Sequence, residues 1–261
     1  MRGRCGCVRA LPARLAPLGM GALLALSLLT ADPAAQAGFF VPPAMPPVWA
    51  LAGQAETAPA VRYGELDRAT CQAELGRRGI AFTPVAEARG VLAPVRLDGP
   101  LHGVTFRTGL PASQRASSPW EIVDCRLALA LDDFAGQLAA HDVVTVVHLS
   151  MYRPPSPRWP DGKLATRHPG GLAIDAATFV KKDGTTLEVQ RDFHGHIGAK
   201  TCGPGTGPRP ATPEATELRG ILCDAADARL FNVVLSPDYN WPHRNHFHLE
   251  VAAGVKWFVV H

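Results

Sequence analysis

The longest helical pattern in the chain lies between Ser118 and Ala140. Apolar residues recur there at intervals of three and four, the spacing of one helical face: Val123, Leu127, Leu131, Phe134 and Leu138. The segment Ser118-Pro119-Trp120-Glu121 precedes them. Its serine can cap a helix, its proline fits a first turn, and its glutamate completes a capping box. The pattern therefore predicts a helix that begins at Ser118 and runs to about Ala140.

Two further stretches favour helices. Thr212-Pro213 opens one that runs to about Arg229, with apolar residues along one side. A shorter candidate covers Leu66–Arg77 and contains Cys71.

Other segments have the patterns of strands. Val143–Ser150 is β-branched and nearly continuous in apolar residues, which predicts a buried strand. Leu172–Phe179 and Thr185–Val189 flank Asp183-Gly184, a hairpin signal. Three more segments are expected to hold strands: Val91–Phe106 with a turn at Asp98-Gly99-Pro100, Asn232–Leu235 and His246–Val251. Strands that pair by hairpins, with helices between groups of them, predict an α+β fold with a mainly antiparallel sheet and flanking helices.

Residues 1–37 have the composition of a secretory signal peptide. Four arginines and no acid lie in residues 1–14, the apolar run Leu15–Leu29 follows, and Ala35-Gln36-Ala37 matches a small-residue cleavage site. An uncleaved anchor is the alternative, but the run is shorter than the roughly 20 residues that span a bilayer. We therefore expect cleavage after Ala37 and no integral membrane segment in the exported chain. The proline-rich residues 38–60 indicate a linker, and residues 61–261 one folded domain.

Composition and charge narrow the class of protein. The chain is 47% hydrophobic and 19% charged, as in globular proteins. It has 26 basic and 23 acidic residues, and residues 1–37 account for four of the former and one of the latter, which leaves 22 of each sign. A neutral chain without blocks of Lys and Arg argues against a nucleic acid or an anionic membrane surface as partner.

The cysteines point to an oxidising compartment. Cys5 and Cys7 lie in the expected signal peptide, and four cysteines follow it: Cys71, Cys125, Cys202 and Cys223. Four cysteines in an exported chain indicate two disulfides with three possible connectivities. Pairing of sequence neighbours, Cys71–Cys125 and Cys202–Cys223, is favoured over a four-cysteine zinc site, because no C-x-x-C pair is present.

Histidines near the C-terminal strand have the spacing of metal ligands. In His243-Arg244-Asn245-His246-Phe247-His248, the last two histidines are two residues apart. On a strand this places His246 and His248 on the same face. Two imidazoles on one face of an apolar strand are typical of a zinc site.

A second segment supplies two more candidate ligands, His168 and Asp175. They are seven positions apart, an odd number, so on one regular strand they would face opposite ways. Pro169-Gly170-Gly171 breaks that regularity, which lets His168 lie in a loop while Asp175 points in from the following strand. His168, Asp175 and one histidine of the last strand would form a zinc site with an open position. Six histidines are set aside as surface residues: His102, His141, His148, His194, His196 and His261.

The segments RHPGGLAID and HRNHFHLEV resemble the H-x6-D and H-x-H motifs of zinc peptidases of the D-Ala-D-Ala carboxypeptidase, lysostaphin and hedgehog type. The order of the motifs, with Asp124-Cys125-Arg126, Ser150-Met151-Tyr152-Arg153 and VVLSPDYNWPH, resembles the bacterial extensin-like C-terminal domain family over roughly Cys71 to Val251. The resemblance implies a hedgehog/D-Ala-D-Ala-peptidase-like version of the α+β fold.

The resemblance also implies a role for each matching residue. His168, Asp175 and His248 match the zinc ligands, and His246 matches a catalytic histidine. Two further catalytic-site candidates are Arg153, which would face a substrate carboxylate or the developing oxyanion, and His243, which would support the site from outside the ligand set.

Three positions depart from the related sequences: Thr166 replaces a serine, Tyr152 precedes Arg153 where a cysteine is common, and Asn245 stands near the place of a glutamate base. The last departure leaves His246 as the best base and puts catalysis more in doubt than metal binding.

Export and resemblance together imply a zinc-dependent peptidase that hydrolyses amide bonds in peptidoglycan stem peptides, as a carboxypeptidase or an endopeptidase. It would act in the periplasm, the cell envelope or the extracellular space. Two alternatives stay open: a non-catalytic cell-wall-binding domain that retains a structural zinc, and a disulfide-stabilised domain without metal.

Overall fold

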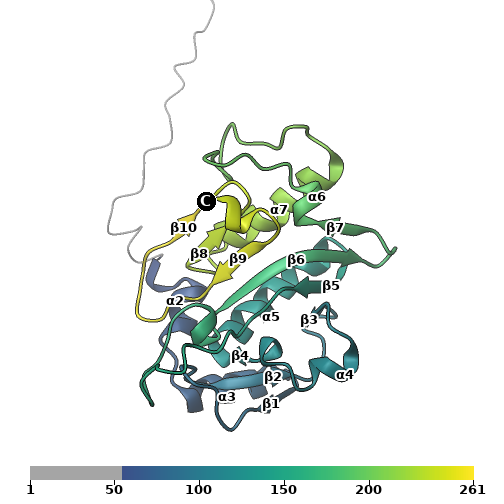
Figure 1. The fold of residues 1–261 in the computed structure, drawn as a ribbon. Coiled ribbons are helices and arrows are strands. Elements are labelled where there is room, and N and C mark those ends of the chain that lie inside the picture. Colours follow the sequence, from purple (N-terminus) through teal and green to yellow (C-terminus); the bar gives the residue numbers. More distant parts are fainter. Residues whose placement is uncertain (1–54) are drawn as a thin grey trace, which may run out of the picture. The chain divides into compact units, whose positions relative to one another are not determined.

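The computed structural model describes residues 55–261, whose arrangement Figure 1 shows. The expected signal peptide with its cleavage site, Cys5, Cys7 and residues 38–54 of the expected linker lie outside the described residues. The expected start of the domain at residue 61 falls inside helix α2 (Pro59–Gly64), of which Ala60 and Val61 are buried.

A seven-stranded sheet carries the centre of the fold, in the order β10-β8-β9-β6-β5-β3 with β7 paired to β6. Its strands are β3 (Thr105–Thr108), β5 (Val143–His148), β6 (Ala173–Lys181), β7 (Thr186–Glu188), β8 (Val233–Leu235), β9 (Phe247–Glu250) and β10 (Val259–Val260). The antiparallel β6–β7 pair confirms the hairpin expected around Asp183-Gly184. The α+β class is also confirmed, but the sheet is mixed, because the β3–β5 and β10–β8 pairs are parallel.

A second sheet of three antiparallel strands lies before α5 in the chain. It consists of β1 (Phe82–Pro84), β2 (Pro94–Leu97) and β4 (Val123–Asp124), with β2 in the middle. After β2 the chain only bends at Gly99, where the sequence predicts a turn, and it turns instead at His102-Gly103, between the bridged residues Leu101 and Val104.

The longest helix begins later than the sequence pattern predicts. Ser118 caps only a 3₁₀ turn, η1 (Pro119–Glu121), where its hydroxyl accepts the Trp120 amide at 3.2 Å. The chain then extends into β4, and α5 (Cys125–Ala140) starts under a cap from Asp124. The prediction of helix is therefore wrong for residues 118–124. The last two of these residues, Val123 and Asp124, form strand β4 and pair with β2. A capping pattern is local and carries no information about this pairing.

The other two long helices lie where the sequence predicts them. α3 (Arg68–Arg77) is capped by Asp67, and α7 (Pro213–Asp227) by Thr212. The short helices α2, α4 (Ala112–Arg115) and α6 (Val189–Asp192) were not predicted. Between residues 55 and 261, the chain forms no helix with the length and hydrophobicity that a membrane span requires.

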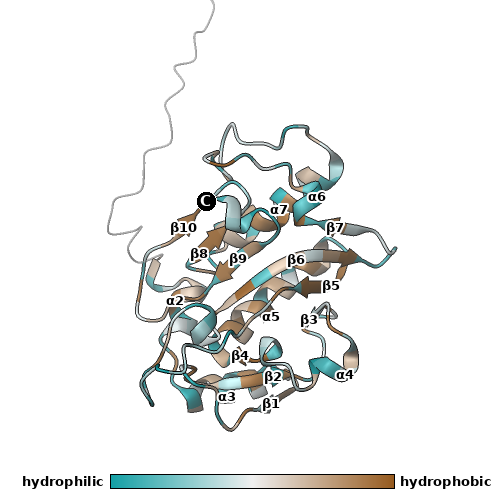
Figure 2. Ribbon diagram, in the orientation of Figure 1, coloured by the Kyte–Doolittle hydropathy of each residue, from teal (hydrophilic) through white to brown (hydrophobic). Residues whose placement is uncertain are grey.

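The core lies between the large sheet and α5, which packs against β5, α3 and α7 (Figure 1). The predicted apolar face of α5 is buried, including Leu127, Leu131, Phe134 and Leu138. Figure 2 shows hydrophobic colours along α5, β5, β8 and β9. The site described below lies on the other face of the central strands.

Two disulfides confirm the predicted pairing. Cys71–Cys125 joins α3 to the start of α5, with Cα atoms 6.0 Å apart. Cys202–Cys223 joins the loop before α7 to that helix, with Cα atoms 5.6 Å apart. Both disulfides therefore involve the long helices of the fold.

The Asp124 carboxylate ties the small sheet to α5. It accepts the Arg126 amide at 3.0 Å and the Ala93 amide at 3.2 Å. It also binds the Arg126 guanidinium at 2.8 Å from Nε and 3.0 Å from Nη2. Both side chains of this ion pair are buried.

Replacement of Asp124 should therefore cost more than loss of a helix cap. We expect Asp124→Ala to lower the free energy of unfolding by about 3–5 kcal/mol, because it leaves the Arg126 charge buried and unpaired. Asp67→Ala is the matched control, since Asp67 caps α3 through the Thr70 amide at 2.8 Å on an exposed surface. Urea denaturation measures both, and equal losses in the two variants would contradict the prediction.

Candidate metal centre

The pairing register of β6 and β9 places two predicted ligands opposite each other. Asp175 is the direct cross-strand partner of His248, and such partners have Cβ atoms about 4.5–5.5 Å apart. Neighbours on the strands, Ile174 and Leu249, belong to the hydrophobic core. Because side chains alternate along a strand, Asp175 and His248 point to the opposite face.

His168 reaches the same point from a 3₁₀ turn, η2 (His168–Gly170), just before β6. Two glycines let this turn pass close to neighbouring backbone. A Cβ on Gly170 would lie 2.3 Å from the Ala165 carbonyl oxygen, and Gly171 has a left-handed φ of 64°. The predicted break in regularity between His168 and Asp175 is thus present.

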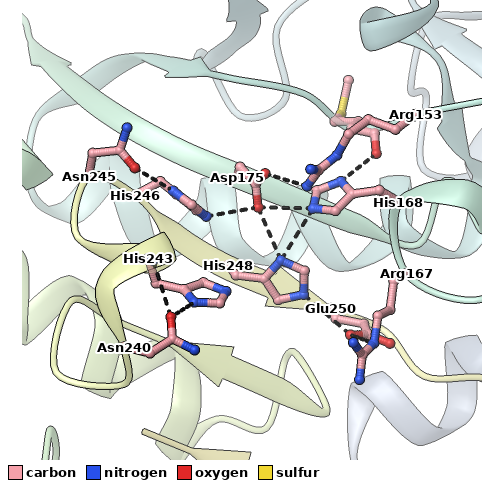
Figure 3. A network of polar contacts seen from close by, with 11 residues as sticks. Arg153, Arg167, His168, Asp175, Asn240, His243, Asn245, His246, His248 and Glu250 are labelled. Atoms are coloured by element: carbon pink, nitrogen blue, oxygen red, sulfur yellow. Dashed lines mark hydrogen bonds and ion pairs between the residues drawn. The ribbon is translucent and has the colours of Figure 1, made fainter. Parts of the chain in front are cut away.

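Three ligand atoms converge on one point (Figure 3). Asp175 Oδ1 lies 2.9 Å from His168 Nε2 and 3.0 Å from His248 Nδ1, and the two nitrogens are 3.3 Å apart. All three side chains are buried. For comparison, tetrahedral zinc with bonds of 2.0–2.1 Å has ligand atoms separated by about 3.3 Å.

Outer partners fix which ring nitrogens face inward. His168 Nδ1 lies 2.8 Å from the Met151 carbonyl oxygen, and His248 Nε2 lies 3.3 Å from Glu250 Oε2. A carbonyl oxygen and a carboxylate oxygen can only accept hydrogen bonds. They therefore select the tautomers in which His168 Nδ1 and His248 Nε2 carry the proton. The two inner nitrogens then present lone pairs toward a carboxylate oxygen. Lone pairs from three atoms at this distance repel one another unless a cation lies between them, so the donor set fits a metal ion.

Burial and charge act on these groups in opposite directions. When no cation lies between them, the imidazoles can carry protons on their inner nitrogens and donate to Asp175. Burial raises the pKa of the Asp175 carboxyl, but in that state the hydrogen bonds from His168, His246 and His248 outweigh burial and hold the pKa well below its usual range. Burial lowers the pKa of His168. Burial also opposes a charge on His248, yet its bonds to Asp175 and Glu250 raise its pKa above the ordinary value.

His246 lies beside the three converging residues. Its Nε2 is 3.3 Å from Asp175 Oδ1, and its Nδ1 is 2.8 Å from Asn245 Oδ1. Asn245 Oδ1 can therefore accept a hydrogen bond from the Nδ1–H of His246, which leaves the Nε2 lone pair facing the centre. Among the described residues, the group whose ligand atoms all lie within 4.8 Å contains His168, Asp175 and His248 but not His246.

Arg153 and His243 also lie at the centre, as the sequence predicts. Arg153 Nη2 donates to Asp175 Oδ2 at 2.7 Å, while about half of the Arg153 side chain stays exposed. The His243 ring centroid is 5.2 Å from that of His246 and 5.7 Å from that of His248. Burial and the neighbouring histidine charges lower the pKa of His243 to about 4, so it is neutral at pH 7.

Sequence reasoning missed the outer partners. Glu250 follows His248 by two residues, so the strand period that groups His246 with His248 also extends to Glu250. The motif therefore indicates that Glu250 lies on the same face as the two histidines. The Met151 carbonyl, by contrast, carries no side-chain signal in the sequence.

The expectation that His148 is a surface residue is wrong. Its side chain is buried at the end of β5, opposite Thr108 of β3, and its Nε2 lies 3.6 Å from Glu121 Oε2. Parallel pairing with β3 covers this position, and that pairing joins strands far apart in sequence.

The residue before the first candidate ligand has a strained backbone. Arg167 has φ 54° and ψ −143°, close to a region that only glycine adopts freely. Its carbonyl accepts the Gly170 amide at 3.0 Å and the Leu172 amide at 2.9 Å, which holds the turn in place. Its side chain is exposed, with Nε 3.8 Å from Glu250 Oε2.

Relief of this strain should stabilise the fold. We expect Arg167→Gly to raise the free energy of unfolding by about 1–3 kcal/mol, the usual cost of such a conformation. Arg167→Ala is the control, because it removes the same side chain beyond Cβ and keeps the strain. Chemical denaturation of the two variants separates the effects, and an equal gain in both would refute the strain argument.

A comparison with protein-family models finds one that covers most of the chain. The model described as "Extensin-like protein C-terminus" matches residues 69–259 of 261, a range that includes every residue of the centre. Comparisons with curated proteins and with solved structures yield no significant match. The match to residues 69–259 shows that the chain belongs to the extensin-like protein C-terminus family.

Proposed function

We propose that this chain is a zinc-dependent peptidase that hydrolyses amide bonds in peptidoglycan stem peptides. The observation that carries the proposal is the inward convergence of His168 Nε2, Asp175 Oδ1 and His248 Nδ1, with both outer imidazole nitrogens already engaged. Two histidines and one carboxylate that leave a position open are a ligand set of catalytic zinc sites.

The same three residues would hold the zinc ion. When bound there, zinc supplies Lewis acidity, which polarises a carbonyl group and makes water a stronger acid near neutral pH. Glu250 and the Met151 carbonyl would keep the two imidazoles in the orientation and tautomer that binding requires.

His246 is the proposed general base and acid. Its Nε2 faces the centre and Asn245 holds its Nδ1, so the ring can take a proton from water and return it to the leaving amine. In this proposal Asn245 does not act as a base itself but orients His246. His243, neutral and in ring contact with His246, is the proposed support for that orientation.

Arg153 is the proposed anion-binding residue. Its guanidinium is fixed at one end by Asp175 and exposed at the other, where it can donate to a developing oxyanion or to a substrate carboxylate. Loss of one such donor typically costs about 2.7–4 kcal/mol of transition-state stabilisation.

The choice of substrate rests on sequence. The H-x6-D and H-x-H motifs resemble those of zinc peptidases, and in this chain the last residue of each motif, Asp175 and His248, lies on one of two neighbouring antiparallel strands. Residues 1–37 resemble a secretory signal, which would place the chain in the periplasm, the cell envelope or the extracellular space. Stem peptides of peptidoglycan are an abundant amide substrate there. The resemblance of the two motifs also supports the proposal of a hedgehog/D-Ala-D-Ala-peptidase-like fold.

One observation favours a second candidate, a non-catalytic cell-wall-binding domain with a structural zinc. Asn245 stands near the place where some zinc peptidases of this kind have a glutamate base, and Arg153 is already bonded to a candidate ligand. Zinc content does not separate the two candidates, whereas hydrolysis does.

A set of histidine variants should separate ligands from the proton carrier. His168→Ala and His248→Ala should lose zinc, because each removes one of three ligand atoms. His246→Ala should keep zinc and lose most hydrolysis of purified muropeptides, because only the proton carrier is removed. Elemental analysis measures the metal, and mass spectrometry of the digest, with and without a chelator, measures turnover.

His102→Ala serves as the control, since His102 contacts Asp132 away from the centre. Loss of zinc in His246→Ala would contradict the ligand assignment. Chelator-sensitive hydrolysis that survives in His246→Ala would move the base elsewhere. No hydrolysis by the zinc-loaded wild type would favour the binding domain.

The outer carboxylate should matter for metal affinity. We expect Glu250→Ala to raise the zinc dissociation constant by about 10–100-fold, because the His248 ring loses the acceptor that fixes its tautomer. Glu188→Ala, which removes a carboxylate at the end of β7, is the control. Titration against a competing chelator measures both constants, and an unchanged value for Glu250→Ala would remove Glu250 from the metal centre.

A further inference from the structure

A cavity of about 520 Å³ lies next to the centre and takes no part in the chemistry described above. It is formed by α6, by the loop after α6 and by the turn η3 (Trp241–His243) with its flanks. Its lining includes Gln190, His194, His196, Ile197, Trp241 and Arg244. Its volume falls within the range of about 300–1,000 Å³ that is common for small-molecule sites.

The cavity and the metal centre share one short element. Trp241, the first residue of η3, lines the cavity, and His243, the last, contacts His246 and His248. Asn240 caps this turn and accepts from the His243 ring at 2.6 Å. A ligand in the cavity would therefore lie beside whatever occupies the centre.

Trp241 is an exposed residue whose ring is contacted by Arg244. Its side chain is 67% exposed, the highest value among the large apolar residues of the described chain. The Arg244 guanidinium lies over the ring, 4.6 Å from its centroid, and donates to the Trp241 carbonyl at 3.2 Å. One ring face is thus covered by a cation, while the rest of this large apolar surface meets water. A large exposed aromatic ring at the edge of a cavity is typical of a binding surface.

The lining limits the chemistry of the ligand. Gln190, His194 and His196 offer hydrogen-bonding groups, and Arg244 adds a cation beside the indole ring. Trp241 and Ile197 offer apolar surface, and no carboxylate is found among the described lining residues. An all-apolar ligand would leave the polar groups of this wall without partners. A pyranose ring satisfies both parts, because its C–H face can stack on an indole while its hydroxyl or acetamido edge accepts and donates hydrogen bonds.

We propose that this cavity binds a saccharide ring of the glycan strand that carries the peptide. The proposal rests on the proposed function for the identity of the strand. It gives the chain a second point of contact with its substrate, on the side of η3 away from the metal ligands.

The test uses a peptide-free sugar, so that binding is measured apart from hydrolysis. Chitotetraose is titrated into the zinc-loaded full chain, with calorimetry and tryptophan fluorescence as readouts. We expect the wild type to bind the sugar and Trp241→Ala to bind it with a dissociation constant raised by about tenfold or more. Trp241→Phe should recover part of the lost affinity. Trp257→Ala is the matched control, because Trp257 is 52% exposed and lies outside the cavity lining.

The saccharide site and the peptidase activity can fail independently of each other. No binding by the wild type, or equal weakening in Trp241→Ala and Trp257→Ala, overturns the saccharide site, whether or not muropeptides are hydrolysed. Binding of acetylated dileucine amide at Trp241 without binding of chitotetraose assigns the cavity to an apolar peptide and also overturns it. Sugar binding that depends on Trp241 but is accompanied by no hydrolysis supports the site and rejects the peptidase.

Discussion

The Asp175 carboxylate holds together the elements that form the centre. One of its oxygens faces nitrogens of His168, His246 and His248, and the other accepts from Arg153. These partners come from the η2 turn, from β9 and the residue before it, and from the segment after β5. A buried carboxylate without such partners would be costly. The position of Asp175 on β6 therefore constrains the register of β9 and the path of the chain before and after it.

A second buried carboxylate, Asp238, links the sugar-sized cavity to the helical layer. It accepts the His196 amide at 2.7 Å and the Thr201 hydroxyl at 3.1 Å, and it pairs with Arg219 of α7 at 3.2 Å. Asp238 lies two residues before Asn240, the cap of η3. The loop that forms one wall of the cavity and the turn that forms the other are thus anchored to the same helix. This arrangement gives both walls of the cavity a common support.

Much of this organisation was predictable because its signals are local. The spacing of His246 and His248 follows from the period of a strand, the Gly170-Gly171 break explains how His168 and Asp175 can meet, and both disulfides join sequence neighbours. The failures involve pairings between distant segments. Ser118 satisfies a capping pattern, yet β2 draws Val123 and Asp124 into a strand and delays the helix to Cys125. Burial of His148 likewise depends on β3, and the Met151 carbonyl that orients His168 has no signature in a sequence.

The place of β9 in the sheet has a consequence for the order in which the chain can mature. β9 lies between β6 and β8, although β6 precedes it by a long stretch of chain, and Asp175 and His248 are 73 residues apart. A nascent chain that has emerged only as far as α7 carries His168 and Asp175 beside an unpaired edge of β6. It contains neither the third ligand nor the strand that would cover that edge. Binding of the proposed zinc ion by this ligand set would therefore be a late event in biogenesis, after the non-local β6–β9 pair has closed.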